Sequence, residues 1–127
     1  MKIVLIISFC FLSILSCSEK KEAIPNCQDA EKLAKSDFEK GKYIYYVYQD
    51  LTDDKSFNKE FSEILKSKNI KVIYKTKYPP SCIIEAEEKL EKSKKCYQLM
   101  MNLEMEAKFG NPFFDSIRIE AKKTHKN

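Results

Sequence analysis

The first sixteen residues restrict what the rest of the chain can fold into. An apolar run from Ile3 to Leu15 follows Lys2 and stops at Ser16-Cys17, after which the chain turns polar at once. Thirteen helical residues span only about 20 Å, whereas the hydrocarbon core of a bilayer is about 30 Å thick. A basic start, a short apolar run and a small residue at its end are typical of a cleaved secretory signal. We therefore predict that residues 1–16 are a signal peptide and that 111 of the 127 residues form the mature protein.

The end of this signal, Ile14-Leu15-Ser16-Cys17, resembles the lipobox of bacterial lipoproteins. The resemblance implies that Cys17 becomes the acylated first residue of the mature chain. Bacterial lipoproteins carry three acyl chains, and two or more chains are needed for stable anchoring to a membrane. The alternative is an ordinary secretory signal, cut nearby, that leaves Cys17 as an unmodified thiol.

The residue after the cysteine bears on which membrane would hold the anchor. In the lipoprotein family an Asp at this position retains the protein at the inner membrane of some bacteria, and here the position is Ser18. The resemblance therefore implies a lipid-anchored protein of the bacterial cell envelope, at the outer membrane rather than the inner.

The mature chain is long enough for one domain and carries little net charge. We predict a lipidated tether at 17–25, a single globular domain at 26–121 and a frayed tail at 122–127. A chain of this length buries roughly two thirds of the surface that its unfolded form exposes. Without Lys2 the formal charge of +4 falls to +3, and Arg118 is the only arginine. Because arginine supplies bidentate phosphate contacts, nucleic acid is not an expected partner.

Apolar spacing, capping residues and β-branched runs together predict a small α/β (or α+β) fold. Its elements follow the order α-β-α-β-α-α and pack helices around a two- to three-stranded sheet with a βαβ unit. Such a unit makes its two strands parallel. The predicted ranges are a helix between Asn26 and Gly41, a strand at Tyr43–Tyr48, a helix at Phe57–Leu65, a strand at Ile70–Lys75, a long helix from Ile84 to Phe109 and a last helix from Asn111 to Ala121.

The cysteines predict one disulfide. Cys10 leaves with the signal and Cys17 is the lipid site, so Cys27, Cys82 and Cys96 remain in an oxidising compartment. Three thiols allow at most one internal bridge. The absence of a Cys-x-x-Cys motif and of a nearby histidine argues against a thiol-redox site.

The predicted helices select one pairing of these thiols. Cys82 and Cys96 would lie about 20 Å apart along the long helix, far beyond the reach of a bridge. The first helix is expected to run back over the sheet, which would bring Cys27 to the carboxyl ends of both strands, where Cys82 follows the second strand. We therefore predict a Cys27–Cys82 disulfide, with Cys96 as a small buried apolar residue in its helix.

Catalytic and metal-binding arrangements find little support in the sequence. His125 is the only histidine and lies in the predicted tail, and the two glycines cannot form a phosphate-binding loop. A run of carboxylates alternates with lysines on a polar helix face, as on a solvated surface; it comprises Glu85, Glu87, Glu88 and Glu91. We predict no catalytic residue, no metal site and no cofactor, and we identify no small-molecule substrate.

Two features of the strands could serve binding. Tyr43, Tyr45, Tyr46 and Tyr48 place aromatic rings on both faces of the first strand, where they could stack on a sugar, a peptide or a partner helix. The alternative is core packing with the hydroxyls at the rim. In the second strand Lys71, Lys75 and Lys77 point one way, and lysines on an edge strand more often block unwanted pairing than recruit a ligand.

The function that these observations favour is binding rather than catalysis. We expect a membrane-anchored envelope lipoprotein whose small domain binds a protein partner or an envelope component. An inhibitor or immunity lipoprotein that neutralises a periplasmic toxin or hydrolase is the alternative. The stretches Cys96–Asn102 and Phe109–Phe114 resemble C-terminal parts of small uncharacterised bacterial lipoproteins, a resemblance that implies no activity.

Overall fold

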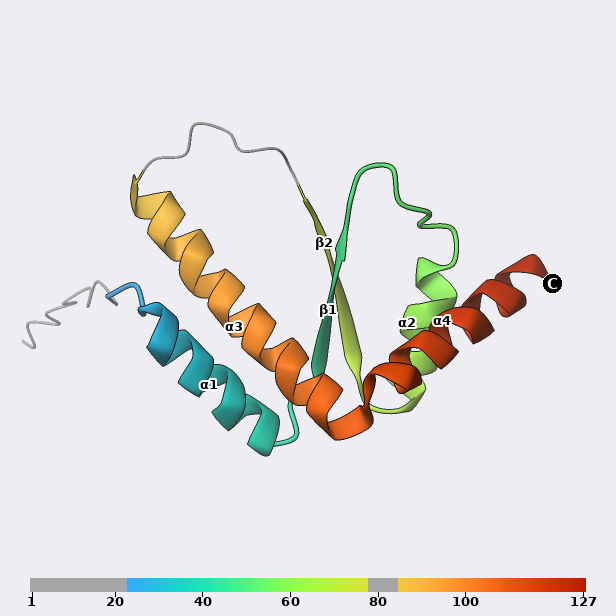
Figure 1. The fold of residues 1–127 in the computed structure, drawn as a ribbon, viewed down its shortest axis with the longest axis horizontal. Helices are drawn as coiled ribbons and strands as arrows, with labels where there is room; N and C mark the ends of the chain where they lie inside the picture. The colour runs from blue at the N-terminus through green and yellow to red at the C-terminus, as the bar shows by residue number, and fades with distance from the viewer. Residues whose placement is uncertain (1–22, 78–84) are drawn as a thin grey trace, which may run out of the picture.

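The computed structural model describes residues 23–77 and 85–127, which form four helices and a two-stranded parallel sheet. The elements are α1 (Cys27–Glu39), β1 (Ile44–Gln49), α2 (Asn58–Ser67), β2 (Lys71–Thr76), α3 (Glu85–Phe109) and α4 (Asn111–Lys126). The predicted α/β class, the order of elements and the parallel βαβ unit are confirmed. In Figure 1, α1 and α3 lie to one side of the strands, and α2 and α4 lie to the other.

Local signals explain where the first elements begin and end. The side chain of Asn26 accepts a hydrogen bond of 2.9 Å from the backbone N–H of Asp29 and so caps the start of α1. Gly41 follows α1 with a φ of 83°, a conformation that glycine adopts without strain. Asn69 ends α2 in the same left-handed region, with a φ of 62°.

The core forms where both helix pairs meet the sheet. The register pairs Ile44 with Lys71 and continues to Gln49 with Thr76. The ring of Tyr45 stacks on that of Phe114 with centroids 3.9 Å apart, which joins β1 to α4. The largest fully buried side chains are Phe61, Phe114, Leu65, Ile70, Met101 and Met105.

Helix α3 packs only one of its faces into this core. Met101 and Met105 are fully buried, whereas Leu99 and Leu103 on the same predicted apolar stretch are 46% and 58% exposed. The stretch is apolar around most of the helix, but a helix can press only one face against its neighbours. Within the described ranges, no helix combines the length and the apolar character that a membrane crossing requires.

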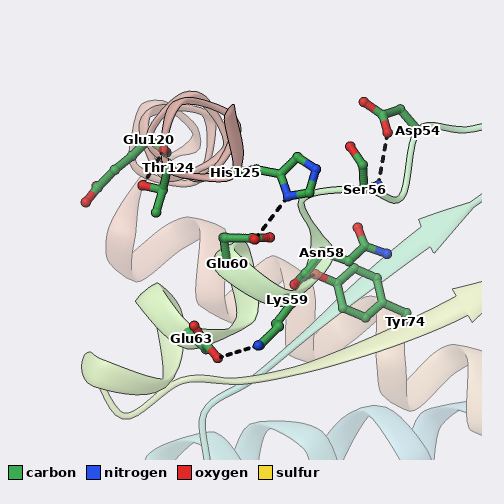
Figure 2. A network of polar contacts seen from close by, with 10 residues as sticks. All are labelled: Asp54, Ser56, Asn58, Lys59, Glu60, Glu63, Tyr74, Glu120, Thr124 and His125. Carbon is green, nitrogen blue, oxygen red and sulfur yellow. Dashed lines mark hydrogen bonds and ion pairs between the residues drawn. The ribbon is translucent and has the colours of Figure 1, made fainter. Parts of the chain in front are cut away.

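The end of α4 is held against α2 rather than frayed. Figure 2 shows the His125 ring directed at Glu60, with Nδ1 3.1 Å from Oε1. The Thr124 hydroxyl donates to the carbonyl oxygen of Glu120 at 3.0 Å, as expected of a continuing helix. Residues 122–126, predicted as a tail, are therefore helical. The hydrogen bond from His125 holds the pKa of the Glu60 carboxyl below its ordinary value.

The predicted Cys27–Cys82 disulfide is wrong, because Cys27 is bonded to Cys96 with Cα atoms 5.4 Å apart. The prediction assumed that α1 runs over the sheet toward the loop after β2. Instead α1 packs along α3, which itself packs on β1. The start of α1 therefore meets the middle of α3, and Cys96 is a half-buried bridge residue rather than a free apolar one. Cys82 and Cys17 lie outside the described residues.

A second link between α1 and α3 is polar. The Tyr97 hydroxyl donates to Asp37 Oδ2 at 2.6 Å, and Lys42 Nζ donates to the same oxygen at 2.7 Å. The hydrogen bond from Lys42 and the one from Tyr97 lower the pKa of the Asp37 carboxyl from its ordinary 3.8. Burial, followed by the bond to Asp37, raises the pKa of the Tyr97 hydroxyl.

We expect the Asp37→Asn variant to unfold more easily by about 1 kcal/mol at neutral pH, because two charge-assisted bonds weaken at a partly exposed site. The pKa of Asp37 is lower in the folded chain than its ordinary value. Its contribution to stability is therefore fully present above pH 3.8 and is lost as the pH falls through the lowered pKa. Urea unfolding of both proteins at neutral and strongly acid pH measures the difference.

The matched control is Glu39→Gln, an exposed carboxyl near the end of the same helix. It should leave the free energy of unfolding nearly unchanged at both pH values. A gap between wild type and Asp37→Asn that stays constant into strong acid would contradict the assignment of this charge.

Candidate functional site

The four tyrosines predicted in the first strand, of which Tyr43 lies just before β1, do not form one binding surface. Tyr45 and Tyr46 are buried, and Tyr43 and Tyr48 are half-buried. Tyr43 packs against Phe38 and Phe109, and the Tyr48 hydroxyl donates to Gln98 Oε1 at 2.7 Å. Burial raises the pKa of the Tyr46 and Tyr48 hydroxyls. The structure thus places most of this aromatic surface against other elements of the fold.

The two edges of the sheet differ, because a side chain of α3 covers backbone groups at the edge of β1. The Asn102 side chain of α3 accepts a hydrogen bond of 2.8 Å from the backbone N–H of Tyr46. Its amide nitrogen donates to the Tyr46 carbonyl oxygen at 2.7 Å. One side-chain amide therefore satisfies both backbone groups that Tyr46 turns away from β2, as a neighbouring strand would.

The edge of β2 has no such cover among the described residues. The backbone N–H groups of Lys71 and Lys77 donate to the carbonyl oxygens of Tyr43 and Gln49 at 3.0 and 2.9 Å. In a parallel ladder alternate residues face the partner strand, so the backbone groups of Val72, Tyr74 and Thr76 face outward. Of the elements in Figure 1, only β1 and α2 pack against β2. We call the outward-facing backbone groups of residues 72–76, together with the side chains of Lys71, Lys75 and Lys77, the β2 edge.

Helix α2 covers one face of β2, and no other described helix packs along the strand's opposite face, where the Ile73 side chain reaches the core. The Tyr74 hydroxyl donates to the carbonyl oxygen of Asn58 in α2 at 2.8 Å, and it accepts a hydrogen bond of 3.2 Å from the Ser62 hydroxyl. Figure 2 shows the Tyr74 ring beneath the start of α2. Because side chains alternate along a strand, Lys71, Ile73 and Lys75 lie on the opposite face. Both lysines are exposed and Ile73 is half-buried.

The surroundings of the β2 edge are strongly cationic. No acidic residue occurs in the sequence between Glu63 and Glu85. The same stretch holds five exposed lysines: Lys66, Lys68, Lys71, Lys75 and Lys77. Within the part of the chain that the structure describes, none of their ammonium groups has a hydrogen bond or an ion pair. Glu63, the nearest acid before them in sequence, faces Lys59 at 4.0 Å.

An open hollow of about 590 Å³ lies at the start of β2. It runs from the turn before β1 to the last turns of α2, so backbone, apolar and cationic groups border one space. Its lining consists of Gly41, Lys42, Tyr43, Ile44, Ser62, Lys66, Asn69, Ile70, Lys71 and Val72. Lys42 is engaged by Asp37, which leaves Lys66 and Lys71 as the unpaired cations of this lining.

A second, smaller hollow of about 260 Å³ lies between α1 and α3. Leu33 and Leu90 line it and are 51% and 39% exposed, and buried Tyr46 and Ser93 also contribute. Its surface is mainly apolar and carries few groups that could orient a ligand. Of the predicted tyrosines, Tyr46 lines this hollow and Tyr43 lines the larger one.

One cluster of side chains has the spacing of metal ligands but serves to hold the fold together. Cys27, Glu31 and Cys96 approach within 4.8 Å of one another, as ligands of a metal ion would. Both sulfurs are joined in the disulfide, however, so neither is a thiolate that could bind a metal. The Cys27 sulfur carries no proton either, and its 3.6 Å approach to Glu31 is a contact rather than a hydrogen bond.

Two parts of this arrangement are absent from the sequence prediction. Asn102 closes the β1 edge, and its only sequence signal is a polar residue between Met101 and Leu103 in an apolar stretch. Lys66 and Lys68 extend the lysine row of β2, and the long interval without acids is the signal that would have included them.

Comparison of the chain with protein-family models, with curated proteins and with solved structures yields no match.

Proposed function

We propose that the protein is a membrane-anchored envelope lipoprotein whose folded domain is a non-catalytic module that binds a protein partner. Cys17 would carry the lipid, and residues 18–26 would connect it to the start of α1 at Cys27. Nine residues can extend to about 30 Å at most, so the domain would stay close to the membrane surface. A partner would then have to reach the domain within that layer.

The observation that carries the binding part of this proposal is the β2 edge. An unpaired strand edge is a ready template for another chain, and proteins protect such an edge by shortening, twisting or covering it or by placing lysines on it. Here six residues of β2 stay regular along their whole length beside β1. Five lysines on and beside the strand, none of them paired with a described residue, add a charge that favours some partners over others.

The non-catalytic part of the proposal is supported by how the ionisable groups are used. Asp37 is engaged with Lys42 and Tyr97, and Glu60 with His125. Asp37 and Glu60 each link two elements of the fold and lie outside the larger hollow, whose lining includes Lys42 from this set. Lys66 and Lys71 line that hollow, whose lining holds no carboxyl group and no histidine, and its Ser62 hydroxyl donates to the Tyr74 hydroxyl at 3.2 Å.

The lipid anchor is tested by the Cys17→Ala variant, expressed in cells that process lipoproteins. We expect the wild-type chain in the membrane fraction with mass added at Cys17, and the variant in the soluble fraction. The physical reason is that several acyl chains hold a protein stably on a bilayer, and alanine at position 17 cannot accept them. A Cys17→Ala variant that remains membrane-bound would contradict the anchor.

The binding module is tested by crosslinking in intact membranes, with a photoreactive group at Lys75 or, as a control, at Lys92 on the exposed part of α3. A protein crosslinked from Lys75 and not from Lys92 supports the proposal. If neither position crosslinks to a protein, the binding function fails. A captured secreted toxin or hydrolase would favour the inhibitor or immunity alternative.

A further inference from the structure

We propose that the β2 edge takes up an extended acidic segment of the partner as a third strand of the sheet. This inference rests on the proposed binding function and specifies the chemistry of the partner. The segment would carry an acidic residue, an apolar residue and a second acidic residue at alternate positions. The argument uses the outward backbone groups of β2, the side chains on its face that points away from α2 and the absence of acids nearby.

The backbone groups supply the affinity for an extended chain. Val72, Tyr74 and Thr76 present three N–H donors and three carbonyl acceptors on the side away from β1. An added strand would pair with this row by main-chain bonds, which is how strand-addition domains hold peptides. Because the β1 edge is already closed by Asn102, β2 is the side on which the described sheet can grow.

The face of β2 that points away from α2 supplies the specificity. Lys71, Ile73 and Lys75 lie there at alternate positions, with the isoleucine half-buried between two exposed ammonium groups. Residues directly opposite on a neighbouring strand interact, and opposite charges stabilise the pair. The best neighbour therefore places an acid opposite each lysine and an apolar residue opposite Ile73. This pattern reads the same in both directions, so it suits a parallel or an antiparallel strand.

The same lysines prevent the edge from pairing with itself. Two copies of β2 placed side by side would bring two rows of ammonium groups together, and like charges opposite one another are destabilising. Blocking self-association and selecting an acidic partner are thus one property of this strand. Lys66 lies on the α2 side of the hollow and would face the same added segment.

An anionic lipid surface could also attract these lysines, but the geometry favours a peptide. Lipid head groups would use the ammonium groups and leave the outward N–H and carbonyl groups of β2 with water. An added peptide strand would use both the ammonium groups and the outward backbone groups. The apolar position at Ile73 between the lysines also suits a side chain of a peptide.

The test is binding of a fluorescent peptide, Thr-Glu-Thr-Val-Thr-Glu-Thr with blocked ends, to the full chain in detergent, followed by anisotropy. We expect saturable binding that weakens by about tenfold in the Lys71→Glu/Lys75→Glu variant, since two favourable pairs become unfavourable. The same variant should bind the peptide in which lysine replaces both glutamates. Lys92→Glu/Lys95→Glu is the matched control with an equal change of charge on α3, and it should bind as wild type does.

Two methylated peptides separate strand addition from simple charge attraction. Each carries N-methyl groups on one of the two alternate sets of backbone nitrogens and keeps both charges. The set that would donate to β2 differs between a parallel and an antiparallel strand, so one of the two peptides should lose binding. Equal binding of both methylated peptides and the unmodified one, or equal binding by Lys71→Glu/Lys75→Glu, would overturn the proposal. Binding to phosphatidylglycerol vesicles without binding to the peptide would overturn it in favour of a lipid surface.

The peptide test and the crosslinking test can fail independently. If Lys75 crosslinks a partner in membranes and the peptide does not bind, strand addition is wrong while the binding function stands. If the peptide binds and membranes yield no partner, the edge recognises acidic strands but the proposed function fails.

Discussion

Replacing both Cys27 and Cys96 by alanine is expected to lower the free energy of unfolding by about 4 kcal/mol, on the chain-entropy model of a crosslink. The two residues are 69 positions apart in sequence, so the bridge closes a long loop and removes many unfolded conformations. It also fastens α1 to α3, and among the described elements α3 is the one on which α1 packs. Urea unfolding of the full chain in detergent, followed by circular dichroism, measures the change.

The matched control for the disulfide is Cys82→Ala, which removes the third thiol and leaves the bridge intact. It should unfold at the same urea concentration as the wild type, and adding a reductant should bring the wild type close to the double variant. Peptide mass mapping should recover Cys27 joined to Cys96. If Cys82→Ala caused the large loss and mapping joined Cys27 to Cys82, the bridge described here would be wrong.

The second large effect is expected at Asn102. Its replacement by leucine keeps a similar volume but leaves the buried Tyr46 N–H and carbonyl oxygen without partners. Each unsatisfied buried group costs about 1–3 kcal/mol, so for the two groups we expect a loss of about 2–6 kcal/mol in the free energy of unfolding. The Tyr46 amide should also exchange its hydrogen with solvent faster than in the wild type, a local readout that general destabilisation does not single out.

Gln98→Leu is the control for Asn102→Leu on the same helix. It removes one side-chain bond, from the half-buried Tyr48 hydroxyl to Gln98, and leaves the backbone of β1 paired. We expect a loss of about 1 kcal/mol or less. If Asn102→Leu cost no more than Gln98→Leu, the closure of the β1 edge by this side chain would have no energetic weight.

Helix and strand positions could be predicted because their signals are local. Apolar residues at helical spacing predicted that α2 would turn Phe61 and Leu65 inward, and both are buried. A short helix between two β-branched runs predicted a parallel pair, which the register confirms. Such patterns depend on neighbours within a few positions, so a single sequence carries them.

The disulfide could not be predicted in the same way, because it depends on which surface α1 selects. The sequence supplies an amphipathic helix with Cys27 at its start, and that helix could pack on the sheet or on another helix. Packing on α3 brings Cys27 to Cys96, whereas packing over the sheet would have brought it toward the loop after β2. The choice is made by contacts between distant segments, which periodicity does not encode.

The β2 edge likewise combines features that local sequence predicts with features that only the tertiary structure determines. The sequence alone predicts that Lys71, Lys75 and Lys77 lie on an edge strand, and it contains no acidic residue in the interval around them. Local alternation also determines that neighbouring tyrosines of β1 face opposite ways. Whether those faces and edges are covered is decided only in three dimensions. Asn102 closes the β1 edge from 56 positions away, while no described element covers the outward edge of β2. Short-range sterics and spacing act within a segment, while exposure depends on what the rest of the chain places beside it.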